Sequence, residues 1–363
     1  MSGTAGQTER QTFDGLDVLR GVAAICVLLR HMSDFFSAPW LMPSGALAVD
    51  LFFVISGFVI AHAYSARLRQ LGVAGFMRFR AVRFYPLYLL GLAIGVAYLA
   101  LIISTGHQTF SLRDVLTAAA FAALFLPAPV SPLSRFGLAD GHSIAPVDSP
   151  GWSLILEMWV NLFYALISPR LSNRVLAALV GMSGGYLVAG SLAAGHWGGW
   201  TWESFDFGVA RTVMSFFLGV LIFEQRACLP RLAWLSGLPG LALAAACFMM
   251  PKSIVFDLMF VFLISPAIVA AEVTATKRYA FAPYFAAMSY CVYAIHEPMV
   301  FFLNSLASKL ALPRPLLGIA FICGLLALSP LLDRFYDRPL RRFLLARRPP
   351  PATDEEKPQL AAA

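Results

Sequence analysis

An arginine and a histidine share one apolar helix near the start of the chain. The stretch LDVLRGVAAICVLLRH places Arg20 and His31 eleven residues apart, which is three helical turns plus about 20°. Both side chains therefore lie on one face, about 16 Å apart along the axis. Histidine takes up protons near neutral pH and arginine binds anions. The pair predicts a general base at one end of the helix and an anion site at the other. Snorkelling of Arg20 to the headgroups is the alternative.

Two acidic residues occupy apolar stretches in which a charge is costly. Asp50, in GALAVDLFFVISGF, opens the second apolar run near the predicted level of His31. An acid beside a histidine fixes its tautomer and raises its basicity. Glu157, in SPGWSLILEMWVNLFY, lies about two turns inside a helix, too deep for the headgroups. We predict that His31, Asp50 and Glu157 converge in the outer half of the membrane as catalytic residues. For Asp50 the alternative is a helix cap.

Two further stretches supply polar residues at helical spacing. In SYCVYAIHEP, Tyr290, Tyr293 and His296 follow one another three apart, and the proline after Glu297 predicts a kink. We expect these three residues to support the substrate site, with a core histidine satisfied by its neighbours as the alternative.

In FMRFRAVRFYPLYLL, Arg80 and Arg83 are also three apart, so both can reach one anion. Arginine binds phosphate through two parallel hydrogen bonds. The spacing therefore predicts a clamp for a polyanion. The alternative is a solvated patch that only sets the orientation of the chain.

The composition indicates that the candidate site residues belong to a membrane protein. Hydrophobic residues make up 59% of the 363 residues and charged residues only 13%, whereas a soluble domain has about a quarter charged. We predict an all-α, polytopic transmembrane helix bundle of about ten spans. The predicted spans are the apolar runs at 16–36, 46–64, 84–104, 152–168, 175–194, 208–224, 233–250, 254–271, 285–307 and 316–333.

Basic residues set the predicted orientation. If the short run 112–126 does not cross, seventeen Lys and Arg lie on one side of the membrane and six on the other. An excess of positive charge marks the cytoplasmic side. We therefore predict that both termini are cytoplasmic and that 112–126 stays on the outer side.

The chain divides into three predicted parts. Residues 1–13 are a polar cytoplasmic N-terminus, 14–340 form the membrane domain, and 341–363 are a basic and then disordered cytoplasmic tail. The five cysteines form no C-x-x-C pair, so no metal site is expected. The net charge of +7 fits basic loops at a membrane and gives no indication of nucleic-acid binding.

Taken together and in this order, these fragments resemble the acyltransferase family 3 of membrane O-acyltransferases. The resemblance covers roughly residues 14–340. It rests on the Arg20-to-His31 spacing, Val49-Asp50-Leu51-Phe52-Phe53 with Ser56-Gly57, Arg80-x-x-Arg83 with Tyr85-Pro86, Trp152-Ser153-Leu154 with Glu157, and YCVYAIHEP.

The resemblance implies transfer of an acyl group, usually acetyl from cytoplasmic acetyl-CoA, to a hydroxyl of a carbohydrate or lipid-linked glycan. Under it, Arg20, Arg80 and Arg83 hold the phosphates of the acyl-CoA, and His31 acts as the base with Asp50 orienting it. An acyl-histidine intermediate is the variant mechanism. The supporting residues are Ser56, Trp152, Tyr290, Tyr293 and His296. The expected setting is the inner membrane of a bacterium, in contact with membrane lipid.

Two other classes of function compete with the enzyme. Intramembrane charges also mark solute pathways, so a transporter of a polar or acidic solute is the main alternative. Internal repeats favour a transporter, and the two halves of the sequence show none. A sensor or scaffold without chemistry is less consistent with ionisable residues gathered at two levels of the membrane.

Overall fold

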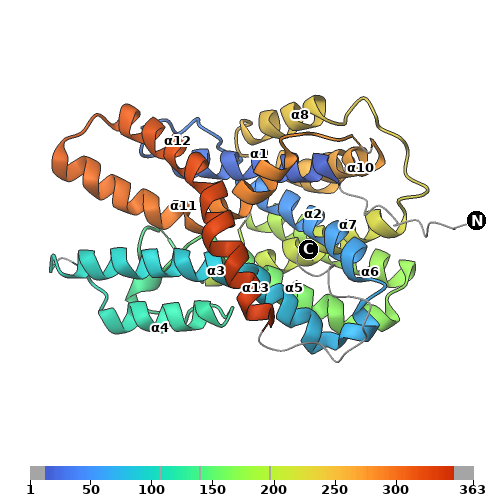
Figure 1. Ribbon diagram of the computed structural model, residues 1–363, viewed down its shortest axis with the longest axis horizontal. Coiled ribbons are helices and arrows are strands. Elements are labelled where there is room, and N and C mark those ends of the chain that lie inside the picture. Colours follow the sequence, from blue (N-terminus) through green and yellow to red (C-terminus); the bar gives the residue numbers. More distant parts are fainter. Residues whose placement is uncertain (1–12, 107, 139, 196–197, 276, 347–363) are drawn as a thin grey trace, which may run out of the picture.

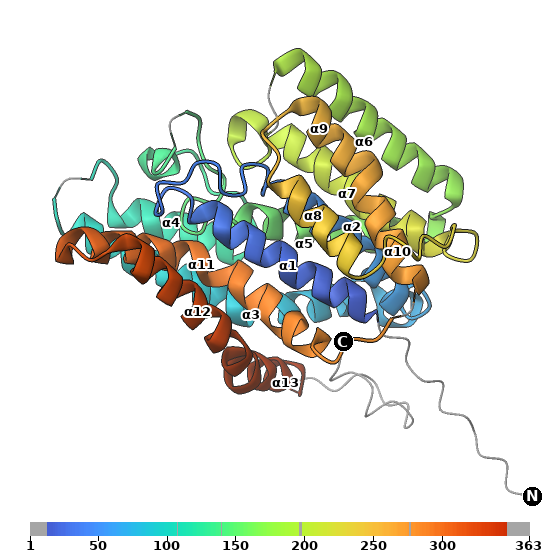
Figure 2. The same ribbon diagram turned by 90° about the horizontal axis from the view of Figure 1, so that it is seen from above.

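The computed structural model describes residues 13–346 except 107, 139, 196–197 and 276. Within these residues the regular elements are helices, and the only strand-like pairing is an isolated bridge between Ser143 and Thr201. The helices pack side by side into a bundle (Figures 1 and 2). The predicted all-α class is confirmed.

Among the described residues, eight helical segments are long and apolar enough to cross a membrane, which confirms a polytopic bundle. They are built from α2 (Leu47–Tyr64), α3 (Leu68–Ile103), α5 (Gly151–Ile167), α6 (Asn173–Ala194), α7 (Phe205–Glu224), α9 with α10 (Ile254–Met259 and Ser265–Ala275), α11 (Ala282–Leu310), and α12 (Arg314–Leu332), which continues towards α13 (Arg338–Ala346).

The other two predicted spans are also helices, but one carries more charged residues and the other is shorter than the eight spanning helices. The first, α1 (Asp14–His31), has 18 residues but carries Asp17 and Arg20 within its first turns. The second, α8 (Leu238–Phe248), has 11 residues, or about 16 Å, which is short of a hydrocarbon core of about 30 Å. All ten apolar runs are therefore helical, and eight meet the requirements for crossing unaided.

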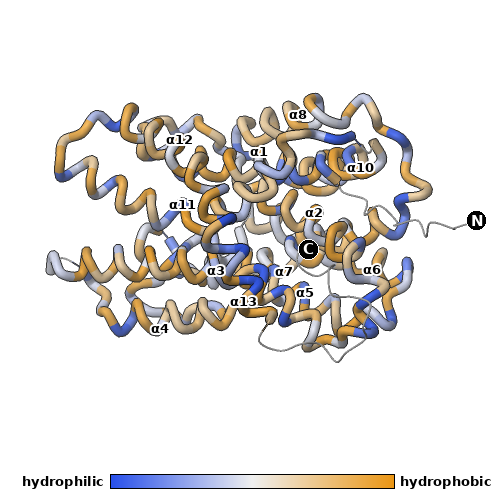
Figure 3. The backbone as a smooth tube through the Cα atoms, in the orientation of Figure 1, coloured by the Kyte–Doolittle hydropathy of each residue, from blue (hydrophilic) through white to orange (hydrophobic). Residues whose placement is uncertain are grey.

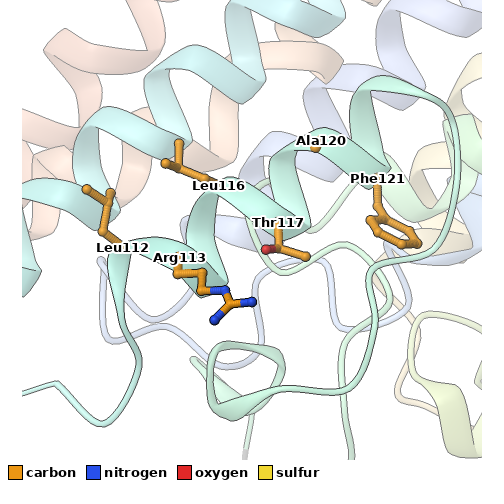
Figure 4. Close-up of a pocket in the computed structure, with 6 residues that line it drawn as sticks. All are labelled: Leu112, Arg113, Leu116, Thr117, Ala120 and Phe121. Atoms are coloured by element: carbon orange, nitrogen blue, oxygen red, sulfur yellow. The ribbon is translucent and has the colours of Figure 1, made fainter.

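The run 112–126 forms a short helix beside α3 (Figure 1). Helix α4 (Leu112–Ala123) begins at a capping box in which Ser111 and Asp114 bond reciprocally, and these bonds hold the pKa of Asp114 below its ordinary value. Its 12 residues span about 18 Å, too short to cross. Along its outer face Leu112, Leu116 and Phe121 border a hollow and are exposed, as expected beside lipid (Figure 4).

Two helix pairs form the centre of the bundle. Helix α1 packs along α11, which brings the first and the penultimate spans together, and α2 packs along α7 (Figure 2). The second pair is unusually close, because a Cβ added at Gly57 would collide with the carbonyl oxygen of Phe216, and one at Gly219 with that of Val54. Small residues allow such backbone contact between membrane helices.

The sequence predicts a kink near Pro298. In the structure α11 is continuous through Pro298, and the proline leaves one backbone carbonyl without its helical hydrogen bond. Proline has no N–H, so the carbonyl oxygen of Ala294 loses its helical donor. The backbone of α3 comes against this oxygen at Gly91, where a Cβ would collide with it. This contact sets the depth of α11 against α3, and therefore the position of His296 and Glu297 in the bundle.

Candidate active site

A pair of histidines lies at one end of the α1–α11 contact. The Nδ1 atom of His31, at the end of α1, is 3.0 Å from Nε2 of His296 on α11. His296 is fully buried, whereas the side chain of His31 is 29% exposed. One ring of the pair is therefore accessible to a substrate and the other is held in the protein.

The surroundings of His296 determine the tautomers of both rings. Its Nδ1 faces the carbonyl oxygens of Val292 and Tyr293 at 2.9 and 3.0 Å, and carbonyls only accept hydrogen bonds, so this nitrogen carries the proton. In the neutral ring Nε2 is then an acceptor, and Nδ1 of His31 must donate to it. The lone pair of His31 is left on Nε2, the atom that can take a proton from a substrate.

One carboxyl group lies beside His31, and a second interacts with the first. Glu297 Oε1 lies 3.8 Å from Nδ1 of His31, and Glu297 accepts hydrogen bonds from the backbone and the side chain of Ser149. Asp148, the residue before Ser149, is 2% exposed, interacts electrostatically with Glu297, and has no hydrogen-bond partner for either carboxylate oxygen among the described residues. Glu297 is thus the acid beside His31, and Asp148 stands behind it.

A second cluster contains the predicted anion-binding arginines. Arg80 on α3 lies 3.3 Å from Oε1 of Glu157 on α5, and the hydroxyl of Ser56 on α2 donates to the same oxygen at 2.6 Å. The Nε of Arg80 is buried and has no partner among the described residues. Because a buried donor without an acceptor is costly, this atom is available to an anionic ligand.

The other two arginines border the same cluster. Arg83 lies 3.7 Å from Asp337 and stacks over the ring of Tyr290, with 5.1 Å from its guanidinium carbon to the ring centre. Arg20 pairs with Asp17 one turn earlier at 3.8 Å, and it is within electrostatic range of Arg80, Arg83 and Glu157. The structure therefore brings the three predicted arginines together from α1 and α3.

Helix α11 connects the two clusters. Tyr290, Tyr293 and His296 follow at three-residue steps, each a rise of about 4.5 Å. Tyr290 donates to the carbonyl of Phe84 beside the arginines, and the hydroxyls of Tyr293 and Ser153 are 2.6 Å apart in the middle. The predicted supporting residues on α11 thus extend from the arginine cluster to the histidine pair.

The prediction that Asp50 orients His31 is wrong. Both oxygens of Asp50 are bound by Arg211 on α7, at 3.0 and 2.5 Å, and both side chains are fully buried. Arg211 also donates to the carbonyl of Gly198 and lies over the ring of Trp152. Asp50 faces α7 because α2 packs along that helix, so Asp50 and Trp152 belong to a buried ion pair.

The predicted convergence of His31, Asp50 and Glu157 is wrong as well. Glu157 pairs with Arg80 and Ser56 in the arginine cluster, while His31 pairs with His296. The register of α5 against α11 accounts for the difference. Ser153, one turn before Glu157, already lies at the level of Tyr293, so Glu157 lies beyond the histidine pair, towards the arginine cluster.

Sequence reasoning missed the partners of the predicted residues. Glu297 lies within the quoted stretch SYCVYAIHEP and Asp148 directly before SPGWSLILEMWVNLFY, but neither was assigned a role, and Asp337, in the predicted membrane domain, was not considered. Arg211 carried the clearest signal, because it is a single arginine inside the apolar run 208–224. Its partner was another intramembrane charge, and only the packing of α2 on α7 shows which one.

No group of three or more His, Cys, Asp or Glu residues in the described part of the chain is arranged to hold a metal ion. The arrangement combines a partly exposed histidine, a neighbouring carboxyl group and a separate arginine cluster. It can transfer a group from an anionic donor held by arginines to a hydroxyl deprotonated by histidine. Fold and site together define the class of a membrane-embedded transferase.

Comparison with known proteins agrees with this class. The chain matches the family described as acyltransferase domain over residues 13–334. Protein 2 in the picA locus of Rhizobium radiobacter is 35% identical over 187 residues, which are 49% of this chain and 93% of that protein. The exopolysaccharide production protein ExoZ of Rhizobium meliloti (strain 1021) is 32% identical over 213 residues, 56% of each chain. No solved structure matches the chain.

The chain belongs to the acyltransferase family 3, because the family match covers most of its length. It is a multi-pass membrane protein of that family.

Proposed function

We propose that this protein transfers an acetyl group from acetyl-CoA to a hydroxyl of a carbohydrate acceptor, with His31 as the general base. The observation that carries the proposal is the hydrogen bond between His31 and His296, because it leaves the lone pair on Nε2 of His31, in a side chain that is partly exposed. A base with that orientation is suited to a hydroxyl group arriving from outside the bundle.

The arginine cluster supports a CoA thioester as the donor. CoA carries a 3′-phosphate and a pyrophosphate, and Arg20, Arg80 and Arg83 offer three guanidinium groups within one region. The unpartnered Nε of Arg80 and the long contact of Arg83 with Asp337 leave hydrogen-bonding capacity for phosphate. A pantetheine arm directed along Tyr290 and Tyr293 would carry the thioester towards His31.

The proposed step transfers one acyl group and one proton. The acceptor hydroxyl oxygen forms a bond to the thioester carbonyl carbon, and its proton moves to Nε2 of His31. The carbon–sulfur bond breaks, and the CoA sulfur takes up the proton from His31 to leave as the thiol. While His31 is charged, Nδ1 still donates to His296 and the carboxylate of Glu297 lies 3.8 Å away, so the imidazolium is stabilised.

An acyl-histidine intermediate is the variant, in which Nε2 of His31 attacks the thioester first. The two routes differ when the acceptor is absent. Incubation of the protein with acetyl-labelled CoA alone labels His31 in the variant route and leaves it unlabelled in the direct route. Digestion and mass spectrometry of the α1 peptide distinguish them.

The relatives support a polysaccharide as the acceptor. One of them is described as an exopolysaccharide production protein, and the aligned region covers 56% of it. We infer that this chain acts on a carbohydrate or a lipid-linked glycan at the end of the bundle where His31 is exposed.

The charge distribution supports a bacterial inner-membrane protein with both termini in the cytoplasm. Most of the Lys and Arg in the described part of the chain lie in the loops after α2, α5, α7 and α10, in the first half of α3 and in α13. Donor and acceptor would then enter from opposite sides of the membrane. Labelling of Arg170→Cys and Lys309→Cys in a cysteine-free chain with an impermeant reagent in whole cells tests this: only Lys309→Cys should react.

Transfer by the purified protein tests the function itself. Protein in detergent, acetyl-labelled CoA and the deacetylated polysaccharide of the producing strain should give labelled polysaccharide and one free CoA thiol for each acetyl transferred. Protein that binds CoA and glycan without releasing thiol would contradict the proposal.

A further inference from the structure

A hollow between α11, α12 and α13 lies outside the proposed donor and acceptor sites. Its walls include Tyr284 and Ala287 on α11 and Pro330 on α12, and three arginines border it: Arg334, Arg338 and Arg342. The hydroxyl of Tyr284 donates to the carbonyl of Leu326, which fixes the tyrosine ring as one wall. The hollow therefore combines an apolar surface with a row of cationic groups.

The positive charge of this hollow is only partly neutralised. Arg338 pairs with Asp333 at 2.6 Å, and the same carboxylate also contacts Arg341. Arg334 and Arg342 are exposed, and among residues 13–346 neither has a carboxylate within 4.0 Å. Of the three arginines that border the hollow, only Arg338 therefore has a carboxylate partner, and it shares Asp333 with Arg341. Such an excess of guanidinium groups is suited to binding a phosphate.

The surface that leads to this hollow is apolar. The spanning window of α12 is only 17% buried inside the protein, and its outer face exposes Leu328 and Leu331. Hydropathy changes abruptly where α12 passes into α13, from orange to blue in Figure 3. Arg334 is three residues beyond Leu331, so the cationic groups begin where the lipid-facing surface ends.

We propose that this hollow binds an anionic phospholipid, with its phosphate between Arg334, Arg338 and Arg342 and its acyl chains along α12. Arginine forks match phosphate oxygens, and the exposed leucines match the acyl chains. A soluble phosphate ester would use the arginines alone and would leave the adjoining apolar face uncovered.

The site has a structural connection to the donor arginines. Asp337 contacts Arg341 at 2.8 Å and Arg83 at 3.7 Å, and Arg78 on α3 donates to the carbonyls of Leu344 and Leu345 at the end of α13. A lipid on the outer face of α13 would hold this helix against α3. Bound anionic lipid should therefore raise the thermal stability of the protein.

Lipid retention tests the site without depending on catalysis. The protein, purified in neutral detergent, is mixed with equal amounts of phosphatidylglycerol and phosphatidylcholine, and the retained lipid is counted by native mass spectrometry. Wild-type protein should retain phosphatidylglycerol preferentially. The double variant Arg334→Gln/Arg342→Gln should bind it on the order of tenfold more weakly.

Matched controls separate this site from general charge effects. Arg170→Gln/Arg174→Gln removes two exposed arginines at the same end of the bundle and should retain phosphatidylglycerol as wild type does. Equal loss in both double variants, or equal retention of both lipids by wild type, would overturn the proposal. Displacement of the lipid by glycerol 3-phosphate or by CoA at equal concentration would also overturn it, because the arginines alone would then be the site.

Discussion

The Nδ1 atom of His31 and the Nε2 atom of His296 lie 3.0 Å apart, although 265 positions separate the two residues in the chain. The contact exists because α1 packs along α11, and its direction is set by two backbone carbonyls one turn before His296. The proposed base, the residue that would orient it and the carbonyls that fix the tautomer thus all lie on α1 and α11.

Substitution of His296 tests whether it orients His31. His296→Ala removes the acceptor for Nδ1 of His31, and misplacement of a catalytic group by about 1 Å can cost about a hundredfold in rate. We expect kcat to fall on the order of tenfold to a hundredfold, with little change in KM for acetyl-CoA. His296→Gln keeps an acceptor near the same position and should recover part of the loss. A kcat equal to that of the wild type in both variants would show that this hydrogen bond has no role in catalysis.

The arginine cluster predicts a loss of donor affinity. Removal of one charge-assisted contact costs about 1.5–3 kcal/mol, so Arg80→Ala or Arg83→Ala should raise the Kd for CoA about tenfold to a hundredfold. Lysine keeps the charge but loses the fork, so Arg83→Lys should be intermediate. Arg174→Ala, at an exposed position at the same end, is the control. Calorimetry that gives wild-type Kd values for all four would reduce the cluster to an orientation signal.

Amide substitutions of Glu297 and Asp148 should affect the transfer rate unequally. Two neighbouring buried carboxyl groups do not both ionise readily. Glu297 receives hydrogen bonds from Ser149 and faces His31, whereas Asp148 has no partner among the described residues, so we expect Asp148 to hold the proton. Asp148→Asn should keep most activity, and Glu297→Gln should lose it. Infrared spectra should show a protonated carboxyl band that disappears in Asp148→Asn; its persistence there would contradict the assignment.

The pair formed by Asp50 and Arg211 predicts a structural role. Asp50→Ala removes the carboxylate that both Nε and Nη2 of the buried Arg211 contact, and loss of one partner of a buried ion pair costs about 3–5 kcal/mol, so the yield of folded protein should fall sharply. Arg211→Met combined with Asp50→Leu replaces the pair by apolar groups and should recover folding. If Asp50 were catalytic, this refolded double variant would be inactive. We expect it to transfer acetyl groups at a rate close to wild type.

Composition and apolar run length were sufficient to predict the helical class and a helix at each of the ten predicted spans. The shortness of α4 was also foreseeable, because Ser111 and Asp114 form a capping box after which only a short apolar run remains. The sequence did not reveal how much of each apolar run is helical. The run that contains α8 is apolar enough for a span, yet the helix itself is only about 16 Å long.

The residue types of the site were predictable, but their pairing was not. Helical spacing relates Arg20 to His31 and Tyr293 to His296, and each pair does lie on a single helix, α1 and α11. Asp50 and Glu157 were assigned by their level in the membrane alone. Their partners depend on which face of α2 meets α7 and how far α5 slides along α3, and tertiary packing decides both.

Acetyl transfer by a folded His31→Ala protein is the most direct test of the account. The variant removes one partly exposed side chain at the end of α1, so it should elute as wild type does and bind CoA with wild-type affinity. General-base catalysis contributes about 10²–10⁴ in rate, and release of CoA thiol in the presence of the glycan should fall by at least that factor. A variant that binds CoA normally and still transfers acetyl groups within about tenfold of the wild-type rate would contradict the assignment of His31 as the base.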